Sequence, residues 1–229
     1  MTEIRIKEKE IVVPGEVLAV GMEVLPGTGT YRIGEKIMAG KLGLASIDGR
    51  TIKLISLSGR YAPKKNDVII CKVIDVNFSG WRLDTNSAYS AMLSMKDATS
   101  DFIQRGADLT QYFDLGEYLV CGIVNVTSQK LIDVTMKGPG LRKLRGGRII
   151  QVDSHKVPRI IGKQGSMVSM IKNETACNIV VGQNGLIWID GQPEQELAAI
   201  RTIRKIEKES HLSGLTEKIK EYLAGNKGE

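Results

Sequence analysis

A four-residue loop, Gly162-Lys163-Gln164-Gly165, constrains the C-terminal third of this 229-residue chain more than any other feature. The residues after it, 166–175, have the apolar spacing of an amphipathic helix. A strand pattern over 147–152 and an apolar stretch precede it, and Asn184-Gly185 between two apolar runs predicts a β-hairpin. A further helix opens at Pro193. The predicted order is strand, short helix, Gly-x-x-Gly, helix, hairpin and helix.

This order is that of a type I KH domain, and the chemistry of its loop suits a sugar-phosphate backbone. Glycine has no Cβ, so a phosphate can approach closely, and the N-terminus of the following helix offers N–H groups to it. A bare Gly-x-x-Gly also occurs in ordinary turns between helices, which is the alternative here. The residues expected to contact RNA are Arg159, Ile161, Gly162, Lys163, Gln164, Gly165, Ser166, Ile171 and Lys172, with Val180 completing an apolar platform for bases.

The positive charge of the chain gathers around this loop. The stretch 137–175 holds nine basic residues against two acidic ones, a surplus of seven, whereas the whole chain carries +6. Such a footprint favours a polyanion as partner, although a solvated basic face would look the same. Within it lies a basic connector, which would either extend the phosphate track or form a solvated turn between domains. Its cations are Arg142, Lys143, Arg145 and Arg148.

The middle of the chain predicts a five-stranded OB-type barrel with a long connection between its third and fourth strands. The apolar runs expected to form strands are 68–76, 81–84, 91–95, 118–126 and 131–136. Trp81 and Tyr89 could stack bases, or they could pack within the barrel. Arg82, Lys96 and Arg105 could meet phosphates, although the connection holds more acidic than basic residues.

The predicted fold class is mostly β with a C-terminal α/β part. A small β domain over 1–62 reads as short strands broken by turns, including a hairpin at Asp48-Gly49. The barrel is expected over 63–138, the KH domain with a C-terminal helix over 139–224, and a frayed tail over 225–229.

The inventory of reactive side chains predicts neither catalysis nor a metal or cofactor site. The three cysteines, Cys71, Cys121 and Cys177, lie far apart in apolar stretches, as buried thiols do. The two histidines, His155 and His211, have no neighbouring nucleophile or ligand set. No apolar run is long enough to span a membrane, and the N-terminus has no signal-peptide core, so we expect a cytoplasmic protein.

Motifs spread along the chain resemble the S1/KH cap subunits of the archaeal exosome. They are Val13-Pro14-Gly15-Glu16, Gly29-Thr30-Tyr31-Arg32, Gly43-Leu44-Ala45-Ser46, Leu57-Ser58-Gly59-Arg60-Tyr61, Lys137-Gly138-Pro139-Gly140-Leu141 and the run from Lys156 to Ser166. The resemblance implies an S1-type barrel and a non-catalytic subunit that recruits and threads single-stranded RNA. It also implies three copies on a hexameric phosphorolytic ring that degrades RNA 3′ to 5′, with the N-terminal domain docked on that ring.

A free-standing RNA-binding regulator of transcription or translation is the alternative. Such proteins also combine barrel and KH modules, so these modules do not separate the two functions. The N-terminal β domain separates them, because a docking domain should associate stoichiometrically with a large complex and a regulator should not. A related second cap protein carries a zinc ribbon, which the cysteine pattern of this chain excludes.

Overall fold

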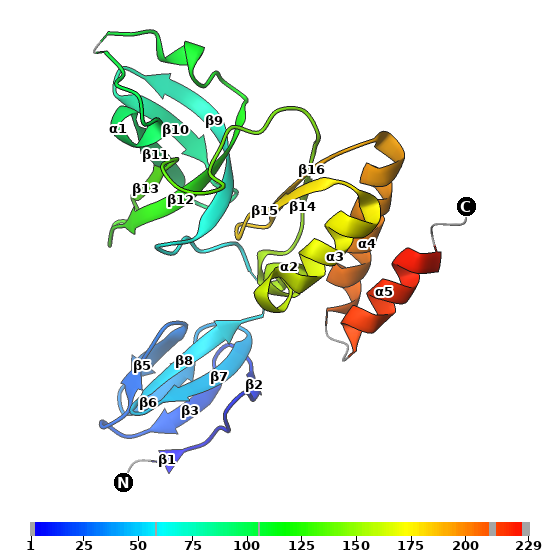
Figure 1. Cartoon of the computed structure of the whole chain (residues 1–229). Coiled ribbons are helices and arrows are strands. Elements are labelled where there is room, and N and C mark those ends of the chain that lie inside the picture. The colour runs from blue at the N-terminus through cyan, green and yellow to red at the C-terminus, as the bar shows by residue number, and fades with distance from the viewer. Residues whose placement is uncertain (1–2, 58, 105, 211–213, 226–229) are drawn as a thin grey trace. The chain divides into compact units, whose positions relative to one another are not determined.

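The computed structural model describes residues 3–57, 59–104, 106–210 and 214–225 (Figure 1). The chain divides into two compact units, Met1–Gly59 and Arg60–Glu229. The first unit is the predicted small β domain, and the second combines the barrel with the KH domain. None of the helices in the described ranges is long and apolar enough to cross a membrane.

The N-terminal unit contains two four-stranded sheets. The first has the order β1 (Glu3–Ile4), β3 (Val17–Val20), β6 (Lys36–Ala39) and β5 (Thr30–Ile33); the second has the order β2 (Ile11–Val12), β7 (Gly43–Asp48), β8 (Thr51–Ser56) and β4 (Leu25–Pro26). The predicted hairpin joins β7 to β8, with Asp48 opposite Thr51. Leu18, Ile37 and Ile52 are fully buried in the core of this unit.

The barrel closes from five strands, which confirms that part of the predicted fold. Its elements are β9 (Val68–Asn77), β10 (Gly80–Asp84), β11 (Ser90–Ser94), α1 (Met95–Ala98), the 3-10 turn η1 (Leu109–Gln111), β12 (Tyr118–Val126) and β13 (Ile132–Thr135). The strand order is β10-β11-β13-β12-β9, with β11 and β13 parallel. The long connection between β11 and β12 carries α1 and η1.

The KH domain has the predicted order of elements. These are β14 (Arg148–Gln151), η2 (Ser154–Lys156), α2 (Val157–Ile161), η3 (Lys163–Gly165), α3 (Ser166–Thr175), β15 (Asn178–Val181), β16 (Leu186–Asp190), α4 (Pro193–Glu209) and α5 (Leu215–Gly225). The three strands form an antiparallel sheet in the order β14-β16-β15, and the helices lie on one side of it (Figure 1). The predicted tail falls on Gly225, where α5 ends, and on 226–229, which lie outside the described residues.

A buried asparagine in the β15–β16 turn joins the KH domain to the barrel. Asn184 is 1% exposed, and its Nδ2 donates to the carbonyl oxygens of Ile70 (2.7 Å) and Thr85 (2.8 Å). Its Oδ1 accepts from the Ile70 N–H at 3.3 Å. A small apolar cluster continues the contact; it consists of Ile70, Val120, Leu144, Leu186 and Trp188. The barrel and KH domain therefore share polar and apolar contacts within one unit.

Candidate nucleic-acid interface

The backbone of the Gly162–Gly165 loop takes a shape that depends on its glycines. Gly162 has φ 75° and ψ 176°, Gln164 has φ 54° and Gly165 has φ 79°. A Cβ on Gly162 would lie 2.7 Å from both the backbone nitrogen and the Cβ of Met167, so this position has no room for a side chain. No atom lies within 4 Å of a Cβ placed on Gly165, so that side of the loop is open to a ligand.

The polar groups of the loop are available to a phosphate. Lys163, Gln164 and Ser166 are exposed, and Lys163 forms no ion pair with any described residue. No side chain of the described residues caps the N-terminus of α3; the Ser166 N–H donates to the Lys163 carbonyl oxygen, and the N–H groups that follow have no capping side chain. Because a helix N-terminus carries partial positive charge, the loop combines N–H donors with a cation.

Two more predicted cations flank the loop on its helices. Arg159 on α2 and Lys172 on α3 are both exposed. The apolar platform is smaller than predicted, because Ile161 and Val180 are partly buried whereas Ile171 is fully buried in the KH core. The prediction of RNA contact by Ile171 is therefore corrected: its side chain lies on the inner face of α3, fully buried in the KH core, and cannot reach a base.

Three of the four connector cations have partners within the chain. Lys143 Nζ lies 2.5 Å from Glu117 Oε2, and Arg148 Nε lies 2.8 Å from Oε2 of Glu196. The Arg142 guanidinium lies 5.7 Å from the Trp188 ring centre. These contacts hold the connector against the barrel and α4. The binding of phosphates along the connector stays a prediction, and it is best supported for Arg145, which is exposed.

The predicted barrel residues that the structure describes lie in three environments: the barrel core, a shallow depression and a pocket beside α1. Trp81 is fully buried, donates from Nε1 to the Phe113 carbonyl oxygen at 2.9 Å and meets the Phe113 ring edge-on. Its ring offers no face to a base, which corrects the stacking prediction in favour of packing. Arg82 and Tyr89 line a depression of about 430 Å³ together with Lys130. Arg105 lies outside the described residues.

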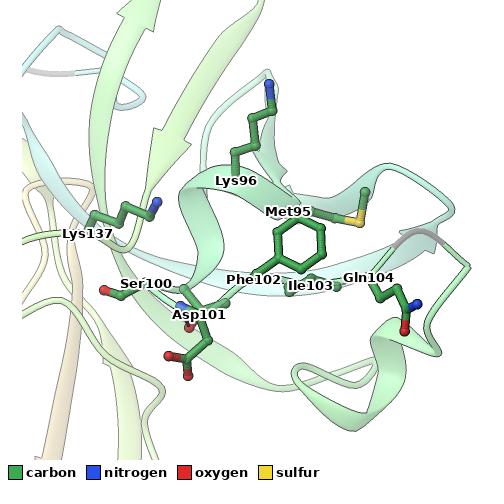
Figure 2. Close-up of a pocket in the computed structure, with 9 residues that line it drawn as sticks. Met95, Lys96, Ser100, Asp101, Phe102, Ile103, Gln104 and Lys137 are labelled. Atoms are coloured by element: carbon green, nitrogen blue, oxygen red, sulfur yellow. Dashed lines mark hydrogen bonds between the residues drawn. The ribbon is translucent and has the colours of Figure 1, made fainter.

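Lys96 lies elsewhere on the barrel. It lines a pocket of about 790 Å³ beside α1, shown in Figure 2. Because β10 and β11 run from the α1 end of the barrel to the Tyr89 loop, Lys96 and Tyr89 mark opposite ends of the same two strands, with Arg82 in the middle of β10. The structure therefore brings Arg82 and Tyr89 together but places Lys96 apart from them.

Two phenylalanines were missed by the sequence reasoning. Phe78, in the β9–β10 turn, is 93% exposed, and Phe102, in the loop after α1, is 90% exposed. Aromatic rings exposed on barrels of this type are platforms on which bases stack. The exposure of Phe78 could have been predicted from the sequence. This residue lies between Asn77 and Ser79-Gly80 in a predicted turn, where a side chain has no core to pack into.

The described residues contain no group of three or more side chains arranged to hold a metal ion. The three cysteines are buried free thiols, as predicted. Burial raises the pKa of the Cys71 and Cys177 thiols, which disfavours the reactive thiolate at neutral pH.

Comparison with known proteins agrees with this architecture. The KH domain family matches residues 147–205. Exosome complex component Rrp4 of Methanobrevibacter smithii is 43% identical over 221 residues, which cover 96% of this chain and 73% of that protein. Rrp4 of Pyrococcus furiosus is 44% identical over 227 residues, which cover 97% of this chain and 86% of that protein.

A solved structure gives the same result. A crystal structure described as that of a candidate RNA-binding protein of the exosome complex superposes with a TM-score of 0.65 at 29% identity. The superposition covers 74% of this chain and 98% of that chain. Sequence and structure comparisons thus agree over most of the chain.

Proposed function

This chain belongs to the Rrp4 family of exosome complex components, and from that membership we propose that it is a non-catalytic subunit that binds single-stranded RNA and delivers it to the exosome for 3′-5′ degradation. The observation that carries the RNA-binding part is the Gly162–Gly165 loop. Its N–H donors, its exposed lysine and its open side at Gly165 suit a phosphate backbone. Its surroundings hold most of the positive surplus of the chain.

In this proposal the KH domain and the barrel bind different parts of the RNA. The KH loop holds the backbone, and the barrel offers stacking surfaces at Tyr89 and Phe78 with Arg82 for phosphate. Because the buried Asn184 joins the modules, RNA would meet them as one fixed surface. We assign the barrel to residues 63–138 and the KH domain with its last helix to 139–224.

The partner of the N-terminal β domain, residues 1–62, would be the hexameric phosphorolytic ring of a cytoplasmic exosome, with three copies of the chain on each ring. An apolar row on the second sheet supports docking: Ile11 lies opposite Leu44, and Leu44 lies opposite Ile55. Ile11 is 63% exposed and Ile55 is 55% exposed, although both are large aliphatic residues. Neighbouring exposed aliphatics of this kind mark protein interfaces.

A capture experiment separates docking from RNA binding. The tagged chain is recovered from native lysate and assayed for phosphate-dependent RNA degradation. We expect Ile55→Asp to lose the ring proteins and the activity while binding RNA normally, and Ile33→Asp, equally exposed on the other sheet, to behave as wild type. Recovery of the wild-type chain alone, or with ribosomes or polymerase, would instead support the free-standing regulator.

A further inference from the structure

The barrel carries a pocket beside α1. Of the residues that line it, only Lys96 is among the predicted RNA contacts. Its volume is about 790 Å³, within the range of sites that hold small organic ligands. Figure 2 shows Phe102 in this pocket next to Met95 and Ile103. Two cations, Lys96 and Lys137, line it as well.

Phe102 has no partner within the described part of the chain that would account for its position. Its ring is 90% exposed, whereas Ile103, the next residue, is 7% exposed and belongs to the barrel core. The loop is therefore anchored by Ile103 and holds the neighbouring ring out in solvent. A large aromatic ring fixed in water next to two lysines matches the combination of stacking platform and cations that binds single-stranded nucleic acid.

Most acidic residues of the surrounding loop keep their negative charge but do not line the pocket, and local hydrogen bonds or an ion pair hold their carboxylates. Asp97 is hydrogen-bonded to Ser94 at the start of α1, and Asp108 caps η1 through Thr110, whose hydrogen bonds lower the pKa of Asp108. Asp114 accepts from the N–H of Leu115, and Glu117 pairs with Lys143 on the connector.

Asp101 is the one carboxylate among the described residues that line the pocket, which also include two lysines. The residues that line the pocket therefore carry two positive charges against one negative charge, even though the loop as a whole is acidic.

We propose that this pocket binds a base of single-stranded RNA stacked on Phe102, with Lys96 and Lys137 at the adjacent phosphates. The proposal rests on the proposed RNA-binding function and adds a second contact point on the barrel. Strands β10 and β11 connect it to the depression at Tyr89, through the exposed pair Arg82 and Met92, which lie opposite each other. Five residues of strand span about 16 Å, a length that one stretch of RNA on such a barrel covers.

The test compares three replacements of exposed apolar side chains in the full chain. Affinity for a fluorescent oligouridine of about 20 nucleotides, long enough for barrel and KH loop together, is measured by anisotropy. We expect Phe102→Leu to lower affinity at least about fivefold, because the aliphatic side chain keeps bulk but cannot stack. Phe102→Trp keeps an aromatic face and should bind more tightly than Phe102→Leu, and Leu115→Ala, 61% exposed outside the pocket, should bind as wild type.

Cross-linking locates the contact directly. Irradiation of the complex with 5-iodouridine RNA followed by trypsin should modify the peptide 97–105, which contains Phe102 as its only aromatic residue. An unchanged affinity of Phe102→Leu, with cross-links confined to the KH domain, would overturn the pocket while leaving RNA binding intact. Loss of exosome proteins from Phe102→Leu with normal RNA affinity would overturn it too and make the pocket a protein contact. Failure of the wild-type chain to bind RNA would overturn the proposed function itself.

Discussion

The replacement Asn184→Ala tests whether the barrel and the KH domain are held together by one side chain. The change removes three hydrogen bonds, to the N–H and carbonyl of Ile70 and to the carbonyl of Thr85. The site is buried, so water cannot take the place of the amide without opening the contact. Each lost bond costs about 1 kcal/mol net, which predicts a loss of about 3 kcal/mol.

The expected change in melting temperature follows from the size of the unit. For a domain of about 150–250 residues, 1 kcal/mol corresponds to about 2–4 °C, so Asn184→Ala should melt about 6–12 °C lower. Circular dichroism follows the whole unit, and tryptophan fluorescence follows Trp188 in the apolar contact and Trp81 in the barrel core.

A matched control makes the result interpretable. Asn178→Ala makes the same chemical change at an exposed position of β15 and should stay within about 0.5 kcal/mol of wild type. If Asn184→Ala melts as the control does, the hydrogen bonds of Asn184 do not stabilise the contact between the two modules, and the view of them as one fixed surface is refuted.

Two further predictions concern the loop and the connector. Gly162→Ala should weaken RNA binding and lower the free energy of unfolding by at least about 1 kcal/mol more than Gly165→Ala does. Both variants carry the strain of a positive φ, but only at Gly162 does the added Cβ also meet Met167; equal effects of the two would contradict the loop geometry. Burial raises the pKa of Glu117, but hydrogen bonds from Lys143 and from the Asp114 N–H outweigh it and leave the pKa below its ordinary value of 4.5. A pKa that folding lowers stabilises the fold fully above the ordinary value, and this stabilisation is lost as the pH falls from there through the folded-state pKa. Glu117→Gln should therefore melt lower than wild type at pH 7, and the difference should shrink as the pH is lowered below 4.5; a constant difference would contradict the ion pair.

Local patterns were enough to predict the KH domain and its loop. The hairpin at Asn184-Gly185, the amphipathic helix after the loop and the glycine positions all depend on residues close in sequence. The same reasoning could have avoided two errors. Trp81 alternates with Arg82 and shares a face with Leu83, and Ile171 lies four residues after Met167 on the apolar side of its helix, so both patterns predicted burial.

Contacts between distant segments could not be predicted in this way. Asn184 bonds to residues about one hundred positions earlier, and Arg148 pairs with Glu196 on a different element. The role of the connector cations depends on these partners, which no local pattern reveals. The exposure of Phe102 is likewise set by the anchoring of Ile103 in the barrel core.

The double replacement Lys163→Asp with Gln164→Asp tests the central claim most directly. Each carboxylate about 4 Å from a phosphate costs about 1 kcal/mol in water and up to about 4 kcal/mol at a partly screened surface. The matched control, Thr216→Asp with Lys218→Asp at exposed positions of α5, makes the same change in net charge. The account predicts at least about tenfold weaker binding of single-stranded RNA by the loop variant, an unchanged melting temperature and near-normal binding by the control. Equal affinity of the loop variant and the control would contradict it, because RNA would then not be held by the KH loop.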